Sequence, residues 1–172
     1  MRVTTLAIAF ASLVLLAPPV FADPIEDCNS NTPDYIIDGC TKLIDGGKAS
    51  DDALAIAYFN RANALDDKGE HDAAIADYTA SIKLKADYVD SYLNRGLSYF
   101  DKKDYQNAIA DFTRAIALKP DFARAFYARA RVYEEQGDLK QALAGYAEAA
   151  KYAPSNKAVQ KKLAEVKQRL GQ

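Results

Sequence analysis

The segment "DFTRAIALKPDF" occupies residues 111–122, and a close variant, "DYTASIKLKADY", occupies residues 77–88. The two segments lie 34 residues apart and share their aromatic, Thr, Ile and Leu positions. Shifting the whole chain by the same 34 residues aligns three copies, at residues 55–88, 89–122 and 123–156. A fixed period of this length indicates a repeat protein in which each copy forms the same small unit of secondary structure.

Each copy has the spacing of two helices joined by a short turn. In the middle copy, Tyr92, Gly96 and Tyr99 are four and three residues apart, which places them on one helical face. A second set with the same spacing follows in that copy: Ala108, Phe112 and Ala115. Small side chains let two helices approach closely, and the aromatic side chains fill the volume beside them. The sequence therefore predicts three helix–turn–helix units.

The period and these positions resemble the tetratricopeptide repeat family over residues 55–156. The middle copy carries nearly the whole signature: Tyr92, Gly96, Tyr99, Ala108, Phe112, Ala115 and Pro120. The other two copies depart from it mildly, at Ala62, Leu65, Ala86 and Ala130. The resemblance implies an all-α fold, a right-handed α-solenoid of three helix pairs whose neighbouring units complete a shared core.

Residues 157–172 follow the third copy and are predicted to form one more helix. Val159, Leu163, Val166 and Leu170 lie on one apolar stripe, and most other positions are Lys, Gln or Glu. This pattern is typical of a helix that caps the open end of a solenoid. Its five basic residues, against a single glutamate, also allow a contact with a membrane or an acidic partner.

Residues 23–54 are predicted to form an N-terminal half-repeat and a linker. The segment "TPDYIIDGCTKLID", residues 32–45, aligns with the second helix of a copy when the linker is four residues longer. Thr32 and Ser50 are expected to cap helices, and Pro33 suits a first helical turn.

The first 22 residues have the layout of a secretory signal peptide. A basic start at Arg2 precedes an apolar stretch, and Val20, Phe21 and Ala22 end in the small residue that signal peptidase accepts. The apolar stretch is too short for a membrane span. We expect cleavage after Ala22 and a periplasmic or secreted protein with no membrane span after cleavage.

Composition and motifs exclude several classes of function. Loss of Arg2 from 22 basic residues leaves 21 against 24 acidic ones, a net charge of −3, which gives no electrostatic basis for nucleic-acid binding. No set of catalytic, cofactor-binding or metal-binding residues is assembled, so we predict no enzyme activity and no cofactor. His71, the only histidine, is interpreted as a packing residue, and Glu134 and Glu135 as part of a solvated face.

Cys28 and Cys40 are the only cysteines, and an exported chain meets an oxidising compartment. Folding back the segment before the first short helix would bring them together. We predict one disulfide that ties down the half-repeat; a redox pair usually has the Cys-x-x-Cys spacing, which is absent here.

Arg61, Arg95 and Arg129 recur at the repeat period. Asp77 and Asp111 follow the first two by sixteen residues, whereas Gly145 occupies the third equivalent place. The pattern predicts a repeated Arg–Asp brace within a helix pair, of the exposed and individually weak kind. An anion contact to a ligand is the alternative.

The resemblance also implies where a partner binds, because the first helix of each pair lines a concave groove in this family. The candidate groove residues are Phe59, Asn60, Asn63, Leu93, Asn94, Leu97, Phe100, Arg124, Tyr127 and Arg131. Some family members clamp a carboxylate with a Lys–Asn–Asn–Lys–Arg set, which falls here on Phe59, Asn63, Asn94, Arg124 and Ala128. Two of the three cationic contacts are missing, so the apolar groove residues are expected to bind a peptide or helix by burial.

Two functions follow as hypotheses. The first is an exported, non-catalytic scaffold or adaptor that holds a protein segment in the groove. The second is a permanent structural subunit of a cell-envelope complex that uses the convex face or the basic last helix. The identity of the partner and the oligomeric state stay open.

Overall fold

The structure is a computed structural model that describes residues 24–171. The predicted signal peptide and its cleavage after Ala22 lie outside the described residues. Every regular element between residues 24 and 171 is an α-helix. In chain order these are α1 (Pro24–Cys28), α2 (Pro33–Asp45), α3 (Asp51–Asp67), α4 (His71–Leu84), α5 (Val89–Asp101), α6 (Tyr105–Leu118), α7 (Ala123–Glu135), α8 (Leu139–Tyr152) and α9 (Lys157–Arg169).

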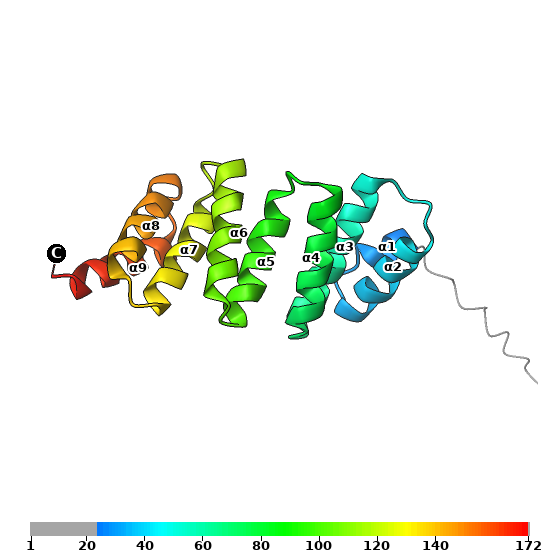
Figure 1. The fold of residues 1–172 in the computed structure, drawn as a ribbon, viewed down its shortest axis with the longest axis horizontal. Helices are drawn as coiled ribbons and strands as arrows, with labels where there is room; N and C mark the ends of the chain where they lie inside the picture. Colours follow the sequence, from blue (N-terminus) through cyan, green and yellow to red (C-terminus); the bar gives the residue numbers. More distant parts are fainter. Residues whose placement is uncertain (1–23, 172) are drawn as a thin grey trace, which may run out of the picture.

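The helices stand side by side in chain order along one long axis, with α1 and α2 at one end and α9 at the other (Figure 1). Each helix packs against the helix before it and the helix after it. Three successive pairs, α3–α4, α5–α6 and α7–α8, occupy the repeat units. The predicted all-α solenoid is confirmed.

The two helices of a pair meet where the sequence places small residues. A Cβ atom added to Gly96 of α5 would lie 2.6 Å from Cε1 of Phe112 in α6. In the next pair a Cβ atom added to Gly145 would lie 2.8 Å from Cβ of Ala130. Phe112 is 0% exposed, so the close approach at Gly96 lets an aromatic ring fill the centre of the pair.

The helix ends follow their sequence signals with one exception. The side chain of Ser50 accepts a hydrogen bond from the backbone N–H of Ala53, as expected for a cap. Thr32 stands at the N-cap of α2, but its side chain makes no capping bond, so that expectation is wrong. α6 and α8 end just before Pro120 and Pro154. α4 ends at the equivalent residue, Leu84, without a proline.

The N-terminal segment before α2 forms a helical turn, α1, which the sequence analysis did not predict. Its backbone lies against Gly39 of α2, where an added Cβ atom would be 2.6 Å from the backbone nitrogen of Cys28. The predicted disulfide joins Cys28 and Cys40 and is confirmed, with 4.5 Å between the Cα atoms. Both cysteines are buried, so the bond fixes the half-repeat from inside.

The C-terminal helix α9 covers the last pair through its apolar stripe. Val159 and Val166 are 4% and 0% exposed, and Leu163 and Leu170 pack beside them. Glu134 of α7 holds the same helix by charge: its carboxylate lies 3.3 Å from Nζ of Lys162 and 2.8 Å from Nη1 of Arg169. The interpretation of Glu134 as a solvated residue is therefore wrong, although its neighbour Glu135 is exposed.

The environment of Glu134 makes the anchoring of α9 sensitive to acid. Burial opposes ionisation, but hydrogen bonds from Tyr146 and Lys162 and the charge of Arg169 outweigh it and lower the pKa of Glu134 below its ordinary 4.5. A carboxylate with a lowered folded-state pKa stabilises the fold above the unfolded pKa, and this contribution is lost as the pH falls through the folded pKa.

We expect Glu134→Gln to weaken the docking of α9 by about 1–2 kcal/mol, because the lost interactions are charge-assisted hydrogen bonds that are partly open to solvent. Hydrogen exchange of the α9 amides at neutral pH measures the loss. Glu135→Gln, one residue later on the exposed side, is the control. The difference between the two variants should shrink below pH 4.5; equal exchange in both at pH 7 would contradict this role.

The predicted Arg–Asp brace is confirmed in the first two pairs. Nε and Nη2 of Arg61 lie 2.7 and 2.8 Å from the two oxygens of Asp77. Arg95 and Asp111 pair in the same way at 2.8 and 2.7 Å. These bidentate pairs are largely buried, with the Asp111 side chain 8% exposed, so they are not the exposed bridges that we expected.

Each arginine also reaches the preceding pair. Nη1 of Arg95 lies 2.9 Å from the hydroxyl of Thr79, and Nη1 of Arg129 lies 3.0 Å from that of Thr113. Arg61 makes the same contact, at 2.9 Å, with Thr41 in α2. One side chain thus joins its own pair to the pair before it, and the half-repeat joins the stack through the same bond.

We expect Asp111→Ala to lower the free energy of unfolding by about 2 kcal/mol, since it leaves the half-buried guanidinium of Arg95 without its carboxylate. A double-mutant cycle with Arg95→Ala, followed by urea denaturation, isolates the coupling between the two side chains. Arg129→Ala is the matched control, because Arg129 has a threonine contact but no ion pair among residues 24–171. Strictly additive effects of the two substitutions would contradict the brace.

Candidate functional site

The first helices of successive pairs, α3, α5 and α7, share one face of the molecule. We call it the first-helix face, and we define it by the residues of these helices that line three pockets. α9 begins where the first helix of a further copy would begin, so it extends this face at its C-terminal end. The pockets lie at the C-terminal, middle and N-terminal parts of this face. Leu97 of α5 lines both the C-terminal and the middle pocket, so these two are adjacent.

The C-terminal pocket has a volume of about 250 Å³ and a mostly apolar lining. α5 and α7 supply one wall, and the start of α9 supplies the other. The lining residues are Leu93, Leu97, Ala123, Arg124, Tyr127, Ala128, Arg131, Ala153, Asn156, Ala158 and Val159. Five of the ten predicted groove residues are therefore brought together in one cavity: Leu93, Leu97, Arg124, Tyr127 and Arg131.

Two arginines stand over aromatic rings at the rim of this pocket. Cζ of Arg131 lies 4.7 Å from the centre of the Phe100 ring, and Cζ of Arg124 lies 6.0 Å from that of Phe122. Such contacts position a guanidinium while leaving its N–H groups free to donate. None of the ion pairs within residues 24–171 involves Arg124 or Arg131.

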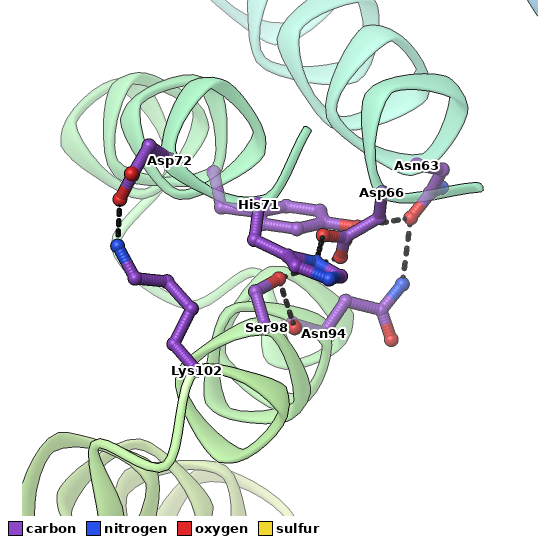
Figure 2. Close-up of polar contacts among 8 residues, drawn as sticks. Asn63, Asp66, His71, Asp72, Asn94, Ser98 and Lys102 are labelled. Carbon is purple, nitrogen blue, oxygen red and sulfur yellow. Dashed lines mark hydrogen bonds and ion pairs between the residues drawn. The ribbon is translucent and has the colours of Figure 1, made fainter. Parts of the chain in front are cut away.

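The middle pocket is polar and lies where α3, α4 and α5 meet. Figure 2 shows Asn63, Asp66, His71, Asn94 and Ser98 converging there. Nδ2 of Asn94 donates to Oδ1 of Asn63 at 2.7 Å, and the hydroxyl of Ser98 donates to Oδ2 of Asp66 at 2.5 Å. Nδ1 of His71 lies 2.9 Å from Oδ1 of Asp66. The Asn94–Asn63 and Ser98–Asp66 bonds join two neighbouring pairs through their first helices, whereas the His71–Asp66 bond lies within one pair.

The packing interpretation of His71 was therefore incomplete, because its ring is bonded to a carboxylate at the edge of a pocket. The hydroxyl of Tyr78 donates to Asn63 at 2.6 Å. Burial, and next the charge of Asp66, raise the pKa of Tyr78, so the phenol stays neutral and acts as a donor. The pocket also includes two exposed carboxylates, Asp67 and Asp101.

The N-terminal pocket is closed on one side by the half-repeat. Nδ2 of Asn60 donates to the backbone oxygen of Cys28 at 3.2 Å and to the side chain of Asn29 at 3.3 Å. Asn63 lines this pocket as well as the middle one. The amide of Asn60 is therefore used to hold α1 and its following turn in place.

Three apolar residues of the predicted groove are mainly internal. Leu93 is 1% exposed and contributes to the buried core as well as to the C-terminal pocket. Phe59 packs against Tyr78 and Tyr88, with ring centres 6.0 and 4.9 Å away. The Phe100 ring lies beneath Arg131 and beside Tyr105. Of the aromatic candidates, Tyr127 lines one of the three pockets described above, and Phe59 and Phe100 line none of the three.

The five clamp positions do not form a basic cluster. Asn63 and Asn94 bond to each other, Phe59 is partly buried and packs against the core, and Ala128 is 6% exposed. Arg124 is the only cation at these positions and lies at the far pocket. The expectation that a Lys–Asn–Asn–Lys–Arg set is incomplete agrees with this geometry.

Sequence reasoning missed Asp66, His71 and Ser98, although one signal was present. Asp66, Phe100 and Glu134 occupy one repeat position, and Tyr78, Phe112 and Tyr146 occupy another. An acid accompanies a tyrosine in the first and third copies, and two phenylalanines stand together in the second. The tyrosine hydroxyl bonds to the acid in the third copy, at 2.7 Å from Glu134. Paired changes of this kind indicate contact.

Two observations limit the chemistry of the described residues. Between residues 24 and 171, no group of His, Cys, Asp or Glu side chains could hold a metal ion. No helix in that range has the length and apolar character needed to cross a membrane. The first-helix face instead offers an apolar cavity with two cations next to a polar, acidic pocket.

Comparison with known sequences gives repeat profiles over most of the three pairs. The profile described as "TPR repeat" matches residues 62–102 and 96–137, and the profile described as "Tetratricopeptide repeat" matches residues 123–156. Together they span residues 62–156 without a gap, which is more than half of the chain. A search of curated proteins gives no match.

Solved structures with the same fold are numerous, and three serve as examples. The second TPR domain of human RPAP3, in complex with the HSP70 peptide SGPTIEEVD, is 27% identical and has a TM-score of 0.62, covering 66% of this chain and 94% of that chain. A structure of MamA is also 27% identical, with a TM-score of 0.66 and coverage of 71% and 69%. The first TPR of Spaghetti (RPAP3), bound to the HSP90 peptide SRMEEVD, is 24% identical, with a TM-score of 0.68 and coverage of 73% and 100%; this likeness concerns the fold alone.

Proposed function

The chain belongs to the tetratricopeptide repeat family, whose repeats span residues 62–156 without a gap, and from this premise we propose that it is an exported, non-catalytic scaffold. The scaffold binds a segment of a partner protein on the first-helix face. The partner segment enters the C-terminal pocket between α5, α7 and α9. The pocket positions the segment, and the stacked pairs supply a rigid support.

The observation that carries this proposal is the C-terminal pocket itself. Its volume of about 250 Å³ is enough for a large side chain, and its walls are Leu, Ala, Tyr and Val side chains from three helices. Polar groups at the rim, Arg124, Arg131 and Asn156, can fix the orientation of a bound backbone. An apolar cavity with a few polar groups is the usual form of an anchor site for a peptide.

One of the similar structures supports a peptide rather than a small molecule as the ligand, because the second TPR domain of human RPAP3 contains a bound peptide, SGPTIEEVD. Fold alone does not assign a partner. The assignment to this chain therefore rests on the pocket.

Export is the part of the proposal that concerns the compartment. The Cys28–Cys40 disulfide suits an oxidising compartment, and residues 1–22 have the layout of a signal peptide. Sequencing the N-terminus of the protein recovered from the cell envelope or medium tests this. We expect the mature chain to begin at Asp23; a chain that keeps residues 1–22 inside the cell would overturn it.

The binding proposal is tested by recovering the partner from native extracts with wild-type protein and two kinds of variant. Arg124→Ala and Asn94→Ala alter the first-helix face, and both should reduce recovery at least several-fold. Lys161→Glu with Lys167→Glu reverses two exposed charges of α9 and should leave recovery unchanged. The opposite pattern would favour the alternative, a structural subunit that uses the basic last helix.

The structure leaves less basic surface for that alternative than the sequence suggested. Of the five basic residues of α9, Lys162 and Arg169 are paired with Glu134. Lys161 lies 3.8 Å from Glu165. The pairing of these residues within the chain favours a capping role for α9 over a charged docking surface.

A further inference from the structure

The first-helix face is divided by charge, and the division limits which segments can bind. Arg124 and Arg131 lie at the C-terminal pocket, and Asp66, Asp67 and Asp101 lie at the middle pocket. Leu97 lines both pockets, so a bound segment that leaves one pocket along the face passes directly into the other.

Within residues 24–171, neither Arg124 nor Arg131 forms an ion pair with a carboxylate. In the first two pairs the brace arginines are bonded to Asp77 and Asp111. Arg124 and Arg131 instead lie over aromatic rings, those of Phe122 and Phe100. Guanidinium groups that border an apolar cavity interact best with a planar carboxylate, which can accept two parallel hydrogen bonds. The cavity beside them accepts an apolar side chain.

The middle pocket has the opposite charge, and neither lysine nor arginine is among the described residues that line it. Asp67 and Asp101 take part in none of the ion pairs within residues 24–171. Figure 2 shows that Lys102, which follows Asp101 in the chain, is directed to Asp72. A bound segment with several consecutive acidic residues would be repelled by Asp67 and Asp101 where it leaves the C-terminal pocket.

Resting on the function proposed above, we propose that the C-terminal pocket selects a segment with a bulky apolar side chain next to a single carboxylate. The apolar side chain occupies the cavity lined by Leu97, Tyr127 and Val159, and the carboxylate lies between Arg124 and Arg131. The middle pocket excludes segments with several consecutive acids. The specificity therefore differs from that needed for a strongly acidic tail such as SRMEEVD, the peptide bound in one of the similar structures.

The test is selection of a random dodecapeptide phage library on the immobilised mature protein, residues 23–172. We expect enriched peptides to carry Leu, Ile, Met or Phe within two positions of an isolated Asp or Glu. On the Arg124→Glu variant the acid should disappear from the enriched set while the apolar residue remains. Arg131→Gln is the second variant. Arg114→Glu is the control, because Arg114 is an exposed residue of α6 that does not line the pocket. The control protein should enrich the same peptides as the wild type.

The charge division is tested with two synthetic probes by fluorescence anisotropy. The best enriched peptide should bind at least ten-fold more tightly than SRMEEVD. The double variant Asp67→Asn, Asp101→Asn should bring the affinity for SRMEEVD several-fold closer to the affinity for the enriched peptide. High salt should also reduce the difference between the two affinities. An enriched set without acids, no enrichment over the starting library, or equal affinity for both probes would each overturn the inference.

These outcomes are separable from failure of the proposed function. Enriched peptides that carry no acid, and whose selection is unchanged by Arg124→Glu, would contradict the charge specificity but not the proposed binding face. Recovery of a native partner that is unchanged by Arg124→Ala and Asn94→Ala, but is reduced by the α9 charge reversal, would contradict the proposed binding face itself.

Discussion

Phe112→Ala should lower the free energy of unfolding by about 3–5 kcal/mol, the largest effect that we expect from any single substitution. Phe112 is 0% exposed, and Gly96 brings α5 within contact of its ring. Truncation removes the ring from the centre of the middle pair and leaves a cavity that the two backbones cannot close. Because each pair supports its neighbours, the loss at the middle pair also weakens the stacking on both sides.

Urea denaturation followed by circular dichroism at 222 nm measures this effect. Ile56→Ala provides a matched control, since Ile56 is 44% exposed and its truncation should change stability by no more than about 0.5 kcal/mol. A loss below about 1.5 kcal/mol for Phe112→Ala, close to that of the control, would show that the helix pairs are not closely packed.

Replacing Cys28 and Cys40 together by serine should destabilise the half-repeat by about 3 kcal/mol, the second largest effect. The disulfide closes a loop with a sequence separation of 12 residues, and the chain-entropy relation for such a loop gives about this value. α1 is a single helical turn with little core of its own, so its position depends on the bond.

The effect should be local to one end of the solenoid. Hydrogen exchange should show loss of protection in α1 and α2 and unchanged protection in α7 and α8, because repeat proteins unfold in units. Gly39→Ala, which keeps both cysteines but forces α1 away from α2, should reproduce part of the change. Full protection of α1 and α2 in the double serine variant would show that packing alone holds the half-repeat.

The fold was predictable from the sequence because the interactions that stabilise a solenoid recur in every 34-residue unit. The period concerns one unit or two adjacent units, as do the small residues Gly96 and Ala108 and the prolines after α6 and α8. The Arg95–Asp111 brace and the disulfide were predictable for the same reason, since each joins residues whose relative places follow from the repeat or from the cysteine count.

Individual contacts between neighbouring pairs were less predictable. Glu134 was assigned to solvent because its partners, Lys162 and Arg169, lie in a helix outside the three copies. Asp66 joins two pairs only because Ser98 of the next first helix is aimed at it. A single sequence shows that such positions recur, but not which side chain of the next unit each of them meets.

The candidate site was predictable as a set of helix positions and not as a surface. The resemblance to the tetratricopeptide repeat family implied that Leu93, Leu97, Arg124, Tyr127 and Arg131 share one face, and they line one pocket. The same resemblance placed Phe59 there, yet its ring lies beside those of Tyr78 and Tyr88 and packs against the core. Periodicity gives the side of a helix, whereas the direction of a large side chain depends on what its neighbours leave unfilled.

The central claim is that the partner binds on the first-helix face, and site-specific photo-crosslinking in cells tests it most directly. A benzophenone amino acid would replace Tyr127 in the C-terminal pocket or, in a second variant, Gln141, an exposed residue of α8 on a second helix. We expect one crosslinked protein from position 127 and none from position 141. Crosslinks from position 141 with none from position 127 would contradict the claim.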